Sequence, residues 1–169
     1  QTPEICKRKN YRYIDLPINV GLTDGVQTGM MYAYRNGYDY ALQFDGDGQH
    51  DPDYIDNMAA EMEKGYNIVI GSRFITQKKP ISLRMFGSNL LQLAIKLTTG
   101  KTLKDPTSGM RMFDKKMIKK LAFAADLGPE PDTVALLVRG GATFSEIQVE
   151  MHERIAGESY LNFSNSVNY

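Results

Sequence analysis

Short apolar segments alternate with amphipathic segments of helical period along most of the 169 residues. Residues 40–44 and 68–70 are apolar on both faces, as expected for strands that helices cover from both sides. Between and after these strands, apolar residues recur every three or four positions, as on the buried face of a helix. The alternation predicts one α/β domain in which a largely parallel sheet lies between helical layers.

Turn and cap residues place the boundaries of these elements. Asp51 before Pro52 predicts a helix start, and Gly37, Gly65 and Gly100 predict helix ends. The expected strands are residues 11–16, 40–44, 68–70, 110–113 and 147–151. The expected helices begin at residue 23 or 24, at 51, at 82, at 114 and near 131. For the helix from Ser82 we expect one buried face, formed by Phe86, Leu90, Leu93, Ala94 and Leu97.

Composition excludes several classes of function. With 20 basic and 20 acidic residues the formal net charge is zero, so no global field favours nucleic acid as a partner. The single cysteine, Cys6, cannot form an internal disulfide and fits a reducing, cytoplasmic compartment. No segment approaches the ~20 apolar residues of a membrane-spanning helix. Neither end resembles a natural terminus, and we expect residues 1–169 to be a single, truncated domain.

An acidic cluster follows directly on the strand at residues 40–44. Asp45 and Asp47 are two positions apart, so in extended backbone their side chains point the same way and can converge on one ion. Two glycines leave room for a ligand, and Gln49 offers a third oxygen. Oxygen ligands suit Mg²⁺ or Mn²⁺. His50 is either a further ligand or a hydrogen-bonding neighbour.

Two other interpretations of this cluster compete with a metal site. A solvated acidic turn is common for Asp-Gly sequences, but it does not explain why an apolar strand leads straight into the cluster. A calcium loop of EF-hand type fits poorly, because position six would be His50, position twelve would be Asp56, and a strand precedes it. Since ligands of open α/β sheets bind beyond the carboxyl ends of strands, we expect the site in the loops after Phe44, Ile70 and Phe113.

The acidic cluster is one of five segments that resemble those of family 2 glycosyltransferases, in the same order. They are Asn19-Val20-Gly21 with Gly25 and Gly29, Asp45 to Pro52, Gly71-Ser72-Arg73, Asp105 to Arg111, and Arg154 to Ser159. The similarity is strongest to the branch with dolichol-phosphate mannose synthase and bacterial polyprenyl-phosphate glycosyltransferases. Met110 stands where the family commonly has Phe. Five ordered matches are far more specific than one acidic pair.

This resemblance implies the GT-A fold, a three-layer α/β/α sandwich with a mostly parallel central sheet, here without its N-terminal strands. It also implies inverting transfer of a sugar from a nucleotide-sugar donor to a polyprenyl phosphate or a growing cell-envelope glycan. The family's opening P-x-Y-N-E-type strand and its nucleoside-contacting acidic motif are absent, so we expect the nucleobase site to lie largely outside this sequence. Peripheral membrane association, at the inner face of the plasma membrane, would come from other segments.

The resemblance also implies roles for individual residues. Asp45, Asp47 and Gln49 would hold the metal, Arg154 would close over the diphosphate, and Asn19 belongs to a substrate-binding segment. An acceptor phosphate would be held by a basic group with nearby hydroxyls, namely Arg73, Arg84, Arg111, Ser108 and Thr107. The general base would be Glu130, with Asp105 and Asp132 as alternates. Ordinary roles compete with these: Arg154 in a surface salt bridge, and Glu130 and Asp132 at a helix start.

Two other functions share parts of this pattern. A catalytically inactive module that binds nucleotide-sugar or lipid phosphate would keep Asp45, Asp47 and Gln49 without turnover. A nucleotidyltransferase would show a Gly-rich opening loop with Arg or Lys, and the sequence contains none.

Overall fold

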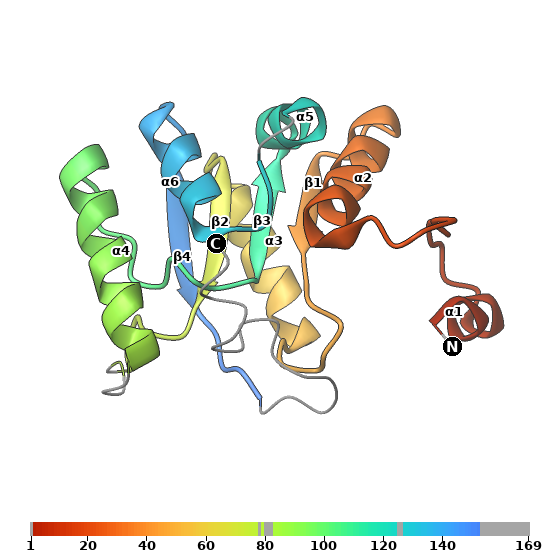
Figure 1. Ribbon diagram of the computed structural model, residues 1–169, viewed down its shortest axis with the longest axis horizontal. Helices are drawn as coiled ribbons and strands as arrows, with labels where there is room; N and C mark the ends of the chain where they lie inside the picture. Colours follow the sequence, from red (N-terminus) through yellow and green to blue (C-terminus); the bar gives the residue numbers. More distant parts are fainter. Residues whose placement is uncertain (1, 78, 80–82, 125–126, 153–169) are drawn as a thin grey trace.

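The computed structural model describes residues 2–77, 79, 83–124 and 127–152. Helices and strands alternate over most of the chain, as the sequence predicts, although the first two helices and the last two each follow one another directly (Figure 1). In order they are α1 (Thr2–Lys9), α2 (Gly21–Arg35), β1 (Tyr40–Gln43), the 3₁₀ turn η1 (Pro52–Tyr54), α3 (Ile55–Met62), β2 (Ile68–Ser72), α4 (Leu83–Thr99), β3 (Arg111–Asp114), α5 (Lys115–Phe123), α6 (Pro131–Arg139) and β4 (Phe144–Gln148). None of the described helices is both long and apolar enough to cross a bilayer.

The four described strands form one sheet in the order β1-β3-β2-β4. The β2–β4 pair is parallel, and β3 runs antiparallel to both of its neighbours. Three strands therefore share one direction, and β3 opposes them. The prediction of a site after Phe113 is wrong for this reason, since reversal carries that end of β3 to the opposite edge. The segment before β3, residues 105–110, instead lies beside the carboxyl ends of β1 and β2.

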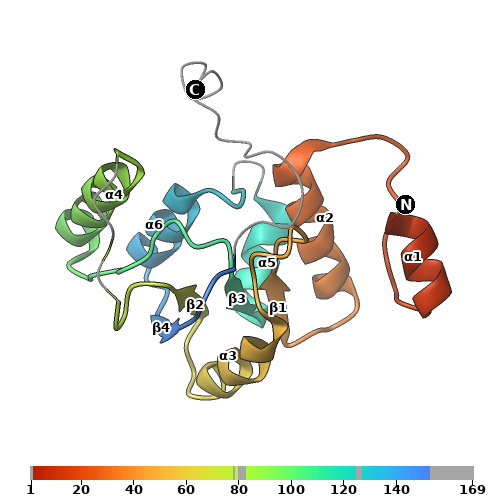
Figure 2. The same cartoon turned by 90° about the horizontal axis from the view of Figure 1, so that it is seen from below.

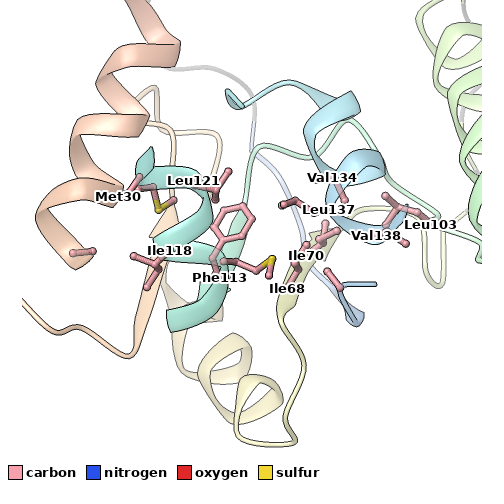
Figure 3. Close-up of a cluster of buried hydrophobic side chains, with 14 of the residues drawn as sticks. Met30, Ile68, Ile70, Leu103, Phe113, Ile118, Leu121, Val134, Leu137 and Val138 are labelled. Atoms are coloured by element: carbon pink, nitrogen blue, oxygen red, sulfur yellow. The ribbon is translucent and has the colours of Figure 1, made fainter. Parts of the chain in front are cut away.

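Helices cover both faces of the sheet, which confirms the three-layer α/β/α arrangement (Figure 2). Ile68, Ile70 and Phe113 face a core shared with α2, α5 and α6 (Figure 3). Val69 and Met112, one residue out of phase, face a second core with the methionines of α3. Alternate strand residues thus serve opposite faces, as the pleat requires, and the fully buried β2 carries the apolar run that predicted it.

Most predicted boundaries agree with the structure, and three do not. Asp51 caps η1 by accepting from the Asp53 amide at 2.9 Å, and Asp114 caps α5 by accepting from the Met117 amide at 2.7 Å. Residues 11–16 form no strand. The helix predicted from residue 23 or 24 begins at Gly21. Strand β4 ends at Gln148, and Val149 continues with one backbone hydrogen bond to Ser72.

Helix α4 buries a different face from the one predicted. Leu90, Leu93 and Leu97 are 62%, 51% and 76% exposed, whereas Met85 and Ile95 are buried. Apolar residues occur on more than one side of this helix, so its pattern alone does not choose a face. Contact with α6 turns Ile95 inward and leaves the leucine face outside. Ser82 and the side chain of Phe86 lie outside the described part of the chain.

Candidate active site

The acidic loop, residues 44–51, leaves the carboxyl end of β1 at the sheet edge. Asp45, Asp47 and Gln49 are all half-buried. The Asp47 Oδ1 accepts from the Gln49 amide at 3.0 Å, which turns the chain back over two residues. Gly48 adopts a φ of 81°, a conformation that L side chains rarely take. The loop is a compact turn with its carboxylates at the edge where the fold class places ligands.

His50 closes this loop from its far end. The side chain is only 6% exposed, its Nδ1 accepts from the Asp45 amide at 3.1 Å, and its ring lies 5.4 Å from that of Phe44. Burial lowers the pKa of the imidazole, an effect that the nearby charges of Asp45 and Asp47 oppose without reversing. The ring is therefore neutral near pH 7, with Nδ1 as the hydrogen-bond acceptor. These contacts support the neighbour role over the ligand role.

The segment before β3 lies directly against the acidic loop. A Cβ placed on Gly109 would lie 2.6 Å from Oδ2 of Asp45 and 3.3 Å from Cε1 of His50. The segment is anchored to β2, because the buried Ser108 hydroxyl donates to the Gly71 carbonyl and the Gly71 amide donates to the Met110 carbonyl. Ser108 thus connects two parts of the backbone. The structure thus brings together residues 105–111 and residues 45–52, two of the five segments on which the resemblance rests.

Arg73 and Asp105 form a bidentate ion pair behind this edge. Nε and Nη2 of Arg73 lie 2.7 and 2.8 Å from the two oxygens of Asp105, which is fully buried. Nη2 also donates to the Thr107 hydroxyl at 3.0 Å. Burial would raise the pKa of the Asp105 carboxyl, but Arg73 more than offsets this and holds the pKa below its ordinary value. A carboxylate held this way is a poor general base, so the contacts do not support that alternate role.

Arg111 lies in the interior with 2% exposure. Its guanidinium donates to the carbonyls of Ser108, Pro129, Glu130 and Pro106 over 2.7–3.2 Å. Burial lowers its pKa to about 10, still far above neutrality, so the group stays charged at pH 7. These contacts tie the start of α6 to the segment before β3. They support a structural role for Arg111 in place of the predicted phosphate contact.

Glu130 and Asp132 lie at the start of α6, where Arg111 attaches it to the sheet edge. Both residues are exposed. Glu130 Oε1 accepts from the Thr23 hydroxyl at 3.2 Å, and Asp132 Oδ1 accepts from the Thr133 amide at 3.0 Å. Asp132 therefore serves as a helix-start residue, whereas Glu130 bridges to α2. Of the three predicted general bases, Glu130 is exposed and also contacts α2, the helix that lines a groove leading to the acidic loop.

The remaining predicted residues divide into two groups. Asn19 accepts from the Gly21 amide at 2.9 Å and so supports the first turn of α2. Arg154 and the side chain of Arg84 lie outside the described part of the structure. The chain can be followed to His152, two residues before Arg154, and the His152 amide donates to the Gln49 carbonyl at 2.9 Å.

Sequence reasoning missed a groove between α2 and β1. Its lining includes Gly21, Gly25 and Gly29 of α2 and ends at Asp45 and Gly46. The three glycines recur every four residues, so they lie on one face of the helix. That spacing is the signal in the sequence that could have revealed the groove. The open face of α2 thus leads to the acidic loop.

The donor set of the acidic loop fits a hard divalent cation. Two carboxylates and one amide oxygen are the kind of ligands that Mg²⁺ prefers. Within the described ranges, no three or more His, Cys, Asp or Glu side chains lie close enough together to hold a metal ion. The acidic loop would therefore not surround the ion with such residues alone. Mg²⁺ typically takes one or two carboxylates and completes its shell with water and substrate phosphates. The loop fits that mode.

The fold and the site's geometry do not by themselves name a family, and comparison with known proteins supplies it. The family model for glycosyl transferase family 2 matches residues 1–122, and the chain belongs to that family. The match ends before Glu130, Asp132 and Arg154. The resemblance read from five sequence segments is thereby confirmed.

Three relatives illustrate the branch. An undecaprenyl-phosphate 4-deoxy-4-formamido-L-arabinose transferase of Shewanella sediminis is 28% identical over 89% of this chain and 43% of its own length. A polyprenol monophosphomannose synthase of Mycolicibacterium smegmatis is 23% identical over 86% of this chain and 57% of its own length. A UDP-N-acetylglucosamine–dolichyl-phosphate N-acetylglucosaminyltransferase of Methanococcus voltae is 33% identical over 62% of this chain and 43% of its own length. The chain spans about half the length of these curated relatives.

Proposed function

We propose that this chain carries the metal-binding part of an active site that transfers a sugar from a nucleotide-sugar to a polyprenyl phosphate, with inversion at the anomeric carbon. The observation that carries the proposal is the acidic loop, with Asp45, Asp47 and Gln49 at the carboxyl edge of the sheet. The printed names of the three relatives, each a transferase or synthase acting with a polyprenyl or dolichyl phosphate, support the acceptor class.

Asp45, Asp47 and Gln49 would hold Mg²⁺ or Mn²⁺. When bound, such an ion supplies positive charge that neutralises the negative charge developing on a departing nucleoside diphosphate. The hydrogen bond from the Gln49 amide orients the Asp47 carboxylate in advance, so less of its freedom is lost on binding. Arg154 would pair with the diphosphate, because its planar, permanently charged fork suits phosphate oxygens.

The acceptor decides whether a general base is needed. A phosphate acceptor is already ionised at pH 7 and can attack without losing a proton, whereas a glycan hydroxyl needs a base within hydrogen-bond reach. Glu130 is the exposed candidate for that role. The proposed polyprenyl phosphate acceptor makes Glu130 dispensable for proton removal, and a glycan acceptor makes it essential. Arg84 is retained as a proposed contact to the acceptor phosphate.

The proposal places the reaction in the cytoplasm, at the inner face of the plasma membrane. The single cysteine fits a reducing compartment, and polyprenyl phosphates reside in membranes. Association with the membrane is proposed to come from segments outside residues 1–169.

The test uses the full-length protein with Mg²⁺, a panel of UDP- and GDP-sugars, and polyprenyl phosphate in detergent. Transfer is expected with at least one donor, and Asp47→Asn is expected to lower kcat/KM by roughly 100-fold or more, since it removes transition-state charge stabilisation. Transfer that survives Asp47→Asn would refute the metal-dependent site. Tight binding of nucleoside diphosphate without any transfer would point instead to the inactive binding module.

A further inference from the structure

Asp45 is positioned by the far end of the acidic loop and by a second segment of the chain. Its backbone amide donates to Nδ1 of His50, and its carboxylate faces the bare Cα of Gly109 from a different part of the chain. His50 contacts the same glycine, since a Cβ there would lie 3.3 Å from its ring. Asp45, His50 and Gly109 therefore form one packed unit, and Asp45 also lines the end of the groove.

We propose that Gly109 and His50 are positioning residues for Asp45: the glycine sets where the carboxylate lies, and the histidine sets the backbone that carries it. This inference rests on the proposed function, because it assumes that the Asp45 carboxylate binds a divalent cation. It assigns to two residues a role in metal affinity that neither fulfils through direct contact with the metal.

Gly109 acts through the absence of a side chain. A Cβ 2.6 Å from Oδ2 of Asp45 is closer than real Cβ atoms approach, so one of the two groups must move. The backbone at Gly109 has little freedom to retreat, because Ser108 bonds to the Gly71 carbonyl and Met110 bonds to the Gly71 amide. The φ of Gly109 lies outside the left-handed region, so alanine meets no backbone strain there. The carboxylate is the group that must shift.

His50 acts through one acceptor atom. It is buried against Phe44, and its backbone forms a bridge with Met151, so the ring has a fixed place from which to hold the Asp45 amide. Asparagine can present its Oδ1 close to the position of Nδ1, whereas leucine has a similar size and no acceptor. The two substitutions separate the hydrogen bond from the packing.

The experiment measures Mn²⁺ affinity of the full-length protein by electron paramagnetic resonance, in the absence of sugar donor. Gly109→Ala is expected to weaken Mn²⁺ binding by about 10–100-fold, the range found when residues that orient metal ligands are changed. The matched control is Gly87→Ala on α4, where an added Cβ meets nothing within 4 Å and affinity should stay unchanged. His50→Leu should weaken binding, and His50→Asn should retain most of it.

A second background separates positioning from general damage. If Gly109 acts through Asp45, Gly109→Ala should have no further effect on Mn²⁺ affinity once Asp45→Ala is present. Equal Mn²⁺ affinity in Gly109→Ala and wild type, or equal losses in His50→Asn and His50→Leu, would overturn this inference alone. Absence of Mn²⁺ binding by the wild type would overturn the proposed function itself. If the Gly109→Ala protein does not fold, the comparison of His50→Asn with His50→Leu tests the inference.

Discussion

The acidic loop and the arginines beside it match the family equally well in sequence but differ in their surroundings. Asp45 and Asp47 are half-buried residues at the sheet edge. Arg73 instead forms a bidentate ion pair with the buried Asp105, and the buried Arg111 donates hydrogen bonds to four backbone carbonyls. The difference teaches that residues of one sequence motif can have their side chains committed to the framework of the site while others remain accessible. The carboxylates of the acidic loop are partly exposed, whereas the guanidinium groups of these arginines are bonded to other parts of the protein.

Removal of the enclosed guanidinium should have the largest effect on stability. Arg111→Met is expected to lower the free energy of unfolding by about 3 kcal/mol or more, because several buried carbonyls lose charged donors. Urea denaturation of the full-length protein measures this. Arg139→Met, on the exposed last turn of α6, is the matched control and should change little. A well-folded Arg111→Met protein that had lost only acceptor binding would break the comparison.

Disruption of the Arg73–Asp105 pair should have the second-largest effect on the free energy of unfolding. Asp105→Asn is expected to cost about 2 kcal/mol, since the amide cannot accept two charged hydrogen bonds and leaves Arg73 poorly paired. The pair also predicts an acid dependence. The folded pKa of Asp105 is below its unfolded value, so its contribution is full above the unfolded value near 3.8 and disappears as the pH falls through the folded pKa.

Urea titrations between pH 6 and pH 2 would sharpen this point. Wild type should lose more stability than Asp105→Asn below about pH 4, so the two curves should converge in acid. Parallel curves over that range would show that the carboxylate is not held by Arg73 as the distances indicate.

The acidic loop should show the smallest effect on stability. Without metal, Asp47→Asn is expected to change the free energy of unfolding by less than about 1 kcal/mol, because it removes a partly exposed charge beside another carboxylate. The same substitution should abolish the stabilisation that added Mn²⁺ gives to the wild type. Thermal melts with and without Mn²⁺ measure both quantities. A large loss of stability in the metal-free protein would mean that the loop, too, is framework.

Much of the candidate site could be predicted because its signals are local. The Asp-x-Asp spacing, the apolar strand before it and the Asp51-Pro52 helix start all lie within residues 40–52, and the strand and the helix start are present in the structure. The partners of Arg73, Asp105 and Arg111 could not be predicted. Arg73 meets Asp105 across 32 positions, and which acceptors surround a guanidinium depends on how loops meet.

The sequence by itself determined the alternation of strands and helices, the acidic turn after β1 and the left-handed glycine ends of α2 and α3, at Gly37 and Gly65. These follow from side-chain period, capping and backbone freedom, which act over a few residues. Only the tertiary structure decided the reversed direction of β3, the exposed leucine face of α4 and the approach of Gly109 to Asp45. Each of these depends on contacts between segments far apart in the chain, and no local pattern encodes them.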